Sequence, residues 1–331
     1  MTNGTMDTGT DVLVIGAGMS GMAAAADLAD GGLRVRVVDK GRGVGGRMAT
    51  RRIGEAVLDH GAQFVTARGE RFQELLGAWE DDGVAEVWCR GFADQADGHP
   101  RWRGRDGMKV LPRQFGNGVE VGLRTRVRAV VREGDGWRVN MEEGGAMRCG
   151  AVVLTAPVPQ SLELMDAGGV VVEAGLRGAL EGIGYERCLA VMAVLDGPSG
   201  MRPPGGMAFD SGPVTWLADN QMKGISPVPC VTVHGSHEFS LAHWDGDREA
   251  AGRLLLEAVS HEVGAGVVEM QVHGWKFSKP ARVFEEACAV VCGSPPLVLA
   301  GDAFAGPKVE GAARSGWAAA EFLLERGRGR G

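Results

Sequence analysis

The sequence predicts an α/β fold with a doubly wound, mainly parallel sheet, into which an α+β domain with a mixed or antiparallel sheet is inserted. The first observation is an apolar strand at 11–15, which runs through Gly16-Ala-Gly-Met-Ser-Gly21 into an alanine-rich helix that ends near Asp30. A second apolar strand follows at 34–38. A strand, a helix and a strand within about 30 residues form a β–α–β unit, which requires parallel strands.

Apolar runs further along the chain supply the other two observations. Residues 297–300 predict a third buried strand near the C-terminus. Alternating apolar runs at 188–195, 214–217 and 230–234 are typical of antiparallel strands. The strands near both chain ends therefore fit one parallel sheet, and the antiparallel strands fit a separate domain between them.

Apolar spacing and glycine positions predict the remaining elements. Residues 40–52 are rich in glycine and arginine and predict a loop. Helical spacing of apolar side chains predicts helices at 69–81, 247–263 and about 310–326. Short strands are expected between 119 and 154, with Gly134-Asp-Gly136 at the tip of a hairpin.

The chain of 331 residues is long enough for about two domains at the usual size of roughly 150 residues. No internal repeat or low-complexity linker divides it. The order of the elements predicts a discontinuous nucleotide-binding domain of residues 8–66, 118–160 and 282–331, and a substrate domain of residues 67–117 and 161–281.

Composition excludes several classes of protein. The net charge is −7, whereas general nucleic-acid binders carry a basic excess, so no nucleic-acid partner is expected. The six cysteines form no C-x-x-C pair and match no metal-site spacing; we expect reduced thiols and no metal, and a redox role for Cys288 and Cys292 stays open. Residues 1–10 carry no signal-peptide core, and no apolar run reaches the roughly 18–20 residues that span a bilayer. These features predict a cytoplasmic protein without a membrane partner.

The turn after the first strand matches a dinucleotide-binding motif in its required context. Gly16 allows the tight turn, Gly18 lets the backbone approach a diphosphate, and Gly21 lets helix and strand pack closely. The helix N-terminus offers free N–H groups and a partial positive charge to the diphosphate. Asp39 ends the second strand, where a carboxylate binds ribose hydroxyls and disfavours a 2′-phosphate.

The residues that follow Asp39 distinguish FAD from NAD. Gly45-Gly46-Arg47 begins six residues after Asp39, which resembles the D/E-x5-G-G-R extension of FAD-binding Rossmann-like oxidoreductases in the monoamine oxidase and phytoene desaturase group. Arg47 can pair with the diphosphate. The stretch around Val127 resembles the segment that holds the adenine in this fold. Arg51 and Arg52 are either exposed or face a second anionic ligand.

Two further stretches resemble parts of the same fold. Residues 59–63, Asp-His-Gly-Ala-Gln, resemble the segment that passes close to the flavin, and Gly301-Asp302 resembles the second FAD fingerprint. Residues 310–312 then open a helix whose N–H groups would face the flavin. The cofactor-binding residues expected on these resemblances are Gly16, Gly18, Met19, Ser20, Gly21, Asp39, Lys40, Gly46, Arg47, Met48, Gly61, Ala62, Gln63, Val127, Gly301, Asp302, Val309, Glu310, Gly311 and Ala312.

The residues of several motifs resemble those of the renalase family, above all its bacterial members, along nearly the full chain. These motifs are residues 40–52 and 59–68, Val233-His234-Gly-Ser, His273-Gly-Trp275-Lys-Phe, and residues 301–311. The chain departs from the family pattern at Gly274, where an arginine is expected, and at Ala303, where a large aromatic is usual.

This resemblance implies oxidation of the 2- and 6-dihydro isomers of NAD(P) to NAD(P)+, with hydride transfer to flavin N5 and reduction of oxygen to hydrogen peroxide. The flavin carries the electrons, so no residue need act as a catalytic acid or base. We expect Trp275 as a pocket wall, and Gln63, His234 and Asn220 as polar contacts to the small-molecule substrate. Core packing of Trp275 and a structural hydrogen bond of His234 remain the alternatives.

Two other functions stay open at this point. The first is an amine oxidase or a related desaturase-type FAD oxidase; the single tyrosine, Tyr185, leaves little for a paired aromatic cage. The second is a flavin-binding or sensor protein without turnover. No cysteine follows Cys292, which excludes flavin attachment through a C-terminal cysteine, so the FAD is expected to be non-covalent.

Overall fold

The computed structural model describes residues 9–92 and 97–328, and within them the chain divides into two compact units. Unit 1 comprises residues up to 46, 112–184 and from 280 onward; unit 2 comprises 47–111 and 185–279. Residues 1–8, which hold most of the segment examined for a signal peptide, lie outside the described residues. The assignment of a cofactor domain and a substrate domain stays a prediction.

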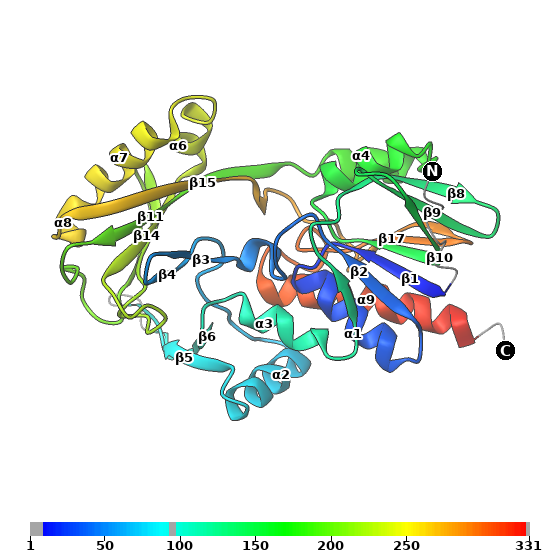
Figure 1. The fold of residues 1–331 in the computed structure, drawn as a ribbon, viewed down its shortest axis with the longest axis horizontal. Coiled ribbons are helices and arrows are strands. Elements are labelled where there is room, and N and C mark those ends of the chain that lie inside the picture. The colour runs from blue at the N-terminus through cyan, green and yellow to red at the C-terminus, as the bar shows by residue number, and fades with distance from the viewer. Residues whose placement is uncertain (1–8, 93–96, 329–331) are drawn as a thin grey trace. The chain divides into compact units, whose positions relative to one another are not determined.

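Unit 1 is built on a parallel-rich sheet, as the sequence predicts (Figure 1). The described residues form an eight-stranded sheet with the path β16-β17-β10-β1-β2-β7, to which β9 and β8 attach beside β10. The strands are β1 (Thr10–Ile15), β2 (Val35–Val38), β7 (Glu120–Gly122), β8 (Val127–Glu133), β9 (Gly136–Met141), β10 (Ala146–Leu154), β16 (Ala289–Gly293) and β17 (Pro296–Leu299). β1 pairs in parallel with both β10 and β2, and β10 pairs in parallel with β17.

Two helices from opposite ends of the chain pack together in unit 1. They are α1 (Met19–Asp30) and α9 (Val309–Arg328), and a Cβ on Gly316 of α9 would lie 2.1 Å from the carbonyl oxygen of Ser20 in α1. Such close backbone approach explains why the first 46 residues and the residues from 280 onward belong to one unit. The other helical segments are η2 (Gln114–Gly116), α4 (Val158–Ala167) and α5 (Ala174–Glu181).

Unit 2 contains the antiparallel sheet that the alternating apolar runs predict. Its path within the described residues is β12-β13-β14-β11-β15, and the pairs β12–β13, β13–β14 and β14–β11 are antiparallel. The strands are β11 (Tyr185–Leu195), β12 (Gly206–Ala208), β13 (Val214–Asp219), β14 (Cys230–Gly235) and β15 (Val267–Pro280). One face packs on α7 (Arg248–Ala258) through Val191, Val233 and Leu255.

A short two-stranded sheet lies on the other face of that antiparallel sheet. Ile53 and Leu58 of the hairpin β3 (Thr50–Ile53) and β4 (Ala56–Asp59) share a buried cluster with Met192 of β11. The remaining elements are η1 (Gly46–Met48), α2 (Glu70–Asp81), β5 (Ala85–Cys89), β6 (Arg101–Gly104), α3 (Val110–Arg113), α6 (His237–Ala242) and α8 (Ser260–Val263).

Two local predictions need correction. Residues 40–52 are not wholly a loop, because η1 and the start of β3 fall within them. Residues 50–53 form a strand since they pair with 56–59, a tertiary contact that their charged sequence does not signal. The helix predicted at 247–263 is divided at Val259 into α7 and α8. No helix of the described residues is both long and apolar enough to cross a membrane.

Candidate functional site

The glycine-rich turn of unit 1 lies where β1 ends between β10 and β2. This is the point at which connections leave a parallel sheet in opposite directions, and ligands of such sheets bind there. Gly16 has φ +116°, and a Cβ on it would lie 2.4 Å from Thr155 Oγ1. A Cβ on Gly21 would lie 1.9 Å from the Gly16 carbonyl oxygen. Both glycines are therefore required by the local backbone.

Gly18 is different, because open space lies in front of it. It is the N-cap of α1, and a Cβ built there meets no heavy atom within 4 Å. The N–H groups of the first helical turn have no helical acceptor and favour an anion. Ser20 in that turn is 4% exposed, and its Oγ has no hydrogen-bond partner among the described residues. The hydrogen-bonding character of this cradle, with free N–H groups and an unused hydroxyl, fits a nucleotide diphosphate.

Asp39 and the loop after it lie against the same turn. Asp39 Oδ2 accepts a 2.7 Å hydrogen bond from the Ala17 N–H, and Oδ1 accepts one of 2.6 Å from Gly41. Each carboxylate oxygen keeps a lone pair for a ribose hydroxyl. Gly46, with φ +53°, would bring a Cβ within 3.3 Å of Gly18 Cα. The two glycine motifs, separate in sequence, thus form one surface of unit 1.

Lys40 makes a side-chain hydrogen bond within unit 1. Its Nζ donates to Gln160 Oε1 at 3.1 Å on α4. Burial lowers the pKa of this lysine. Its predicted contact with the cofactor stays a prediction.

The C-terminal motif of unit 1 is also built from close backbone approaches. The Gly301 N–H donates to Ser315 Oγ at 2.8 Å, and Asp302 is 9% exposed. α9 begins at Val309, with Glu310 in its first turn and Ala312 after it. A Cβ on Gly311 would lie 2.2 Å from the carbonyl oxygen of Gly306. Met19 in α1 and Val127 at the start of β8 are buried.

The predicted cofactor residues Arg47, Met48, Gly61, Ala62 and Gln63 lie in unit 2. The Ala62 N–H donates to the Arg47 carbonyl oxygen at 2.9 Å, and a Cβ on Gly61 would come within 1.9 Å of that oxygen. Arg47 NH1 donates to the Phe277 carbonyl oxygen of β15 at 3.3 Å. Met48 is buried. The contacts of these residues with a flavin remain predictions.

His60, His273 and Trp275 form a ring cluster in unit 2. The His60 ring stacks on Trp275 with centroids 5.3 Å apart, and His273 lies edge-on to both rings at 5.0 and 4.3 Å. Trp275 Nε1 donates to the His60 carbonyl oxygen at 2.7 Å. Trp275 is thereby fixed in orientation, and its ring also lies against Gly61.

Four buried polar atoms of unit 2 lack a hydrogen-bond partner among the described residues. They are His60 Nδ1, Gln63 Oε1, Trp216 Nε1 and His234 Nε2. Trp216 and His234 are paired residues of neighbouring strands, so their side chains share one face of the sheet. Buried polar atoms are almost always hydrogen bonded, so such a group points to a ligand or ordered water.

Gln63 and Asn220 use their remaining groups inside the fold. Gln63 Nε2 donates to the carbonyl oxygens of Asp59 and Gly61, at 2.7 and 3.0 Å, which leaves Oε1 without a partner. Asn220 is fully buried; its Oδ1 accepts from the Asp59 N–H, and its Nδ2 donates to Thr232 Oγ1. The structure therefore gives Asn220 a role in positioning Asp59, and its substrate contact stays a prediction.

A buried ion pair holds the start of the loop that carries His60 and Gln63. Lys223 Nζ lies 2.6 Å from Asp59 Oδ2, and both side chains are fully buried. Asp59 Oδ1 also accepts hydrogen bonds from Thr50 Oγ1 and the Met108 N–H. Burial lowers the pKa of Lys223, and the adjacent Asp59 carboxylate opposes that shift.

The three histidines of this region are neutral at physiological pH. Burial lowers the pKa of His60 to about 3, and that of His234 and His273 to about 4. Arg51 lowers the pKa of His60 and His273 further, whereas no carboxylate raises either one. Neutral imidazoles offer one donor and one acceptor each and are suited to hydrogen bonding.

An aromatic cluster borders this region, and sequence reasoning missed it. Phe64, Phe92 and Trp216 lie 4.9–5.7 Å apart between ring centroids, and Trp88 joins them at 5.1 Å from Phe92. These residues lie on separate segments with no shared period. The one local signal was Phe64, which directly follows the predicted Gln63.

Several other features fall outside this region. His237 begins α6, and its Nδ1 accepts a hydrogen bond from the Arg187 N–H. No cluster of three metal-binding side chains occurs among the described residues. All six cysteines are unpaired, and burial raises the pKa of the Cys288 thiol. At Gly274, a Cβ would lie 2.0 Å from the Arg248 guanidinium, so a side chain of α7 fills that space.

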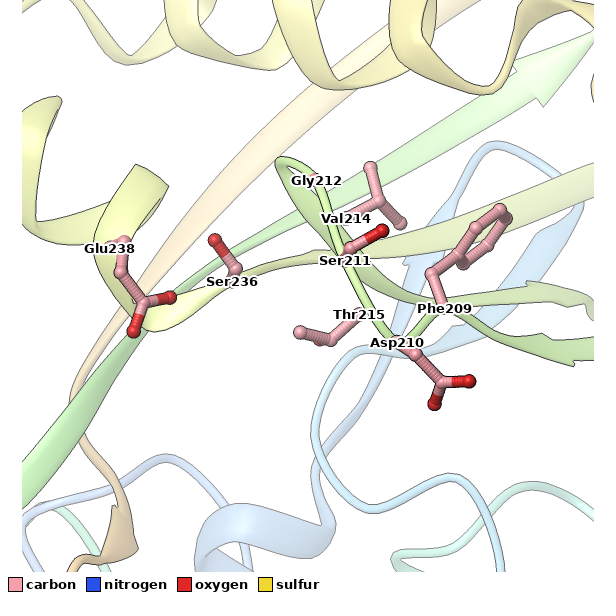
Figure 2. A pocket seen from close by; sticks show the side chains of 8 residues that line it. All are labelled: Phe209, Asp210, Ser211, Gly212, Val214, Thr215, Ser236 and Glu238. Carbon is pink, nitrogen blue, oxygen red and sulfur yellow. The ribbon is translucent and has the colours of Figure 1, made fainter.

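A separate pocket of about 320 Å³ opens in unit 2 between the turn before β13 and the start of α6 (Figure 2). None of the predicted site residues lines it. Two of its three hydroxyls are used in the fold, because Ser236 Oγ caps α6 and Thr215 Oγ1 donates to the His234 carbonyl oxygen. The lining residues are Phe209, Asp210, Ser211, Gly212, Val214, Thr215, Ser236 and Glu238.

Comparison with protein families gives the class of this protein. Residues 14–79 match the NAD(P)-binding Rossmann-like domain, and residues 87–324 match the flavin containing amine oxidoreductases. The second match covers most of the chain, which therefore belongs to the flavin containing amine oxidoreductase family. The protein is a flavin-dependent oxidoreductase.

Among individual proteins, the chain is similar to renalase from Mus musculus. The two are 24% identical over 269 residues, which cover 74% of this chain and 78% of renalase. The resemblance to renalase predicted from the motifs is thus confirmed.

Solved structures share the fold. A protein from Exiguobacterium sp. 255-15, provisionally named protoporphyrinogen oxidase, matches with a TM-score of 0.73 and 13% identity over 97% of this chain and all of that chain. Wild-type putrescine oxidase bound to putrescine matches with a TM-score of 0.67 and 16% identity over 96% of this chain and 99% of that chain. At these identities the likeness establishes the fold alone.

Proposed function

We propose that the protein binds FAD non-covalently and oxidises the 2- and 6-dihydro isomers of NAD(P). In the overall reaction, the dihydronicotinamide, one O2 and one proton give NAD(P)+ and H2O2. The substrate ring loses a hydride, which carries two electrons, and oxygen receives those electrons with two protons. The likeness to renalase supports this choice of substrate, and the cysteines, all unpaired, support a cytoplasmic location.

The observation that carries the proposal is the group of buried polar atoms beside the Trp275 cluster that have no hydrogen-bond partner within residues 9–92 and 97–328. Gln63 Oε1 accepts hydrogen bonds, Trp216 Nε1 donates them, and the neutral His60 and His234 can do either. A nicotinamide is a flat ring that carries a carboxamide with both a donor and an acceptor. A carboxamide can use both the Gln63 Oε1 acceptor and the Trp216 Nε1 donor, whereas an alkylammonium ion has no acceptor to offer that donor.

The residues of the chain would bind and orient, and they would not transfer protons. In unit 1, the first turn of α1 and Asp39 would hold the diphosphate and ribose of FAD. When bound, the flavin supplies hydride acceptance and passes electrons to oxygen. In unit 2, Trp275 would stack on the nicotinamide, and His234 and Gln63 would fix its carboxamide. Fixing a reacting ring in place supplies much of the rate enhancement of such a transfer.

The test is anaerobic mixing of the purified protein with each dihydro isomer of NAD, and separately with amines, while the flavin absorbance is followed. We expect rapid bleaching by the dihydro isomers and recovery of colour when air is admitted. Ordinary NADH serves as the matched control, because it differs only in the position of the added hydrogen. Bleaching by an amine alone would make the protein an amine oxidase, and no bleaching by any reductant would favour a sensor without turnover.

A further inference from the structure

We propose that Arg51 forms an anion subsite that binds a phosphate of the nucleotide substrate. This inference rests on the proposed function and deepens it, because it makes the substrate a phosphate-bearing dihydronicotinamide nucleotide and not a free base or a riboside. The ligand class is a phosphate monoester or diphosphate attached to the reacting ring through ribose.

The position of Arg51 on β3 directs its side chain toward the strand that carries Trp275. Side chains alternate along a strand, so Arg51 shares a face with Ile53, which is buried against Met192 of the antiparallel sheet. Arg51 is half-buried, and its NH1 donates to Gln271 Oε1 on β15 at 3.4 Å. Arg52 has the opposite orientation and is exposed.

The guanidinium of Arg51 has most of its hydrogen-bonding capacity unused. Of its five N–H donors, only one is bonded to a described residue, and that contact is long and to a neutral amide. No described carboxylate lies within ion-pair distance of it. The Gln271 amide makes two contacts. Its Nε2 donates to Glu269 Oε1 at 3.4 Å, and its Oε1 faces Arg51.

The spacing along β15 suits a nucleotide. Gln271, His273 and Trp275 alternate with their neighbours and share one face of the strand. At about 3.3 Å per residue, His273 lies roughly 7 Å and Gln271 roughly 13 Å along the strand from Trp275. A nicotinamide ring on Trp275 would therefore extend its ribose past His273 and its phosphate toward Arg51.

The charges around the subsite favour an anion. Arg51 acts on both His60 and His273, lowering the pKa of each, and no carboxylate offsets it at either ring. A neutral His273 still carries one N–H, which can donate a hydrogen bond to a phosphate oxygen. Glu269, the nearest acid on this face of β15, is exposed and is bonded to Gln271.

The experiment compares R51Q with R52Q in the flavin-loaded protein. R52Q removes the same charge from the next residue of β3, on the opposite face, and so controls for a general change in electrostatic potential. Two substrates are used for each variant: the 6-dihydro isomer of nicotinamide mononucleotide, and its riboside, which lacks only the phosphate.

We expect the ratio of KM for the mononucleotide to KM for the riboside to rise about ten- to hundredfold in R51Q, because a charge-assisted hydrogen bond to phosphate is lost. In R52Q the ratio should stay within about twofold of the wild-type value. An unchanged ratio in R51Q, or an equal rise in both variants, would overturn the subsite.

Calorimetry separates a failure of the subsite from a failure of the proposed function. Oxidised nicotinamide mononucleotide should bind the wild-type protein about tenfold or more tightly than R51Q, whether or not any dihydro isomer is oxidised. Equal or absent binding would reject the subsite. If the dihydro isomers fail to bleach the flavin while this difference holds, the proposed function is wrong and the anion subsite stands. Inorganic phosphate alone is titrated in parallel, and tighter binding of phosphate than of the mononucleotide would indicate an adventitious ion only.

Discussion

Replacing Gly18 with valine should empty the flavin site while leaving the fold intact. Gly18 has φ −81° and ψ −176°, an extended conformation that any residue adopts. A Cβ there meets no heavy atom within 4 Å. The free energy of unfolding of the flavin-free protein should therefore change by about 1 kcal/mol or less.

The loss of flavin affinity should be much larger. The valine side chain would stand in front of the N–H groups that open α1, next to Ser20 Oγ, which has no hydrogen-bond partner in the part of the chain that the structure describes. Losing two charge-assisted hydrogen bonds to a diphosphate, at roughly 1.5–3 kcal/mol each, weakens binding by about 100-fold or more. The purified variant should carry flavin on about a tenth of the chains or fewer, measured as the ratio of flavin to protein absorbance.

Gly21→Ala is the matched control for this experiment. Its methyl group would lie 1.9 Å from the Gly16 carbonyl oxygen, so the backbone must shift, and both flavin content and the melting temperature of the flavin-free protein should fall. A Gly18→Val protein that is purified yellow, with one flavin per chain, would refute the assignment of this turn as the diphosphate site.

Three further predictions follow from unit 2. Trp275→Ala should keep the bound flavin but slow its reduction by a dihydronicotinamide about tenfold or more, since a stacking wall is lost; unchanged stopped-flow kinetics would remove Trp275 from the pocket. Lys223→Met leaves the Asp59 carboxylate buried without a counter-ion, which should cost about 3–5 kcal/mol and lower the melting temperature of the unit by roughly 6–20 °C. The double variant with Asp59→Asn should recover part of this loss, and simple additivity of the two single losses would contradict the pairing. Folding lowers the pKa of His60 and His234 from 6.5 to about 3 and about 4. Below about pH 6.5 the unfolded chain therefore binds more protons at these residues than the folded chain does, which favours unfolding. The free energy of unfolding should therefore fall by about 2 kcal/mol for each histidine between pH 7 and pH 5. In His234→Gln, the free energy of unfolding from denaturant titrations should fall less steeply over the same pH range.

The fold class and the glycine turn could be predicted from the sequence because they depend on short-range rules. The period of apolar residues identifies β1, β2 and the antiparallel strands, and the spacing of Gly16 and Gly21 reports steric limits within a single turn. The likeness to renalase was predictable for the same reason, since it rests on continuous motifs. In the strands, the glycine turn and these motifs, the residues that determine the structure are close together in sequence.

Segments that gain structure only from distant partners were not predictable. The charged residues 50–53 form β3 because they pair with β4, and the predicted loop there was wrong. Nothing near Phe64 in sequence indicates that Phe92 and Trp216 gather beside it. The orientation of Arg51 toward Gln271, 220 positions away, likewise depends on how two sheets pack.

The sequence by itself determined that this chain forms a glycine-rich turn in a parallel sheet and resembles flavin oxidoreductases. The tertiary structure decided which polar groups are satisfied and which are left for a ligand. Lys223 and Asp59 are 164 positions apart and neutralise each other, while His234 Nε2 and Gln63 Oε1 are buried and unpartnered among the described residues. The physical reason is that a hydrogen bond is satisfied by whichever atom lies about 3 Å away in space, and chain proximity does not fix that atom.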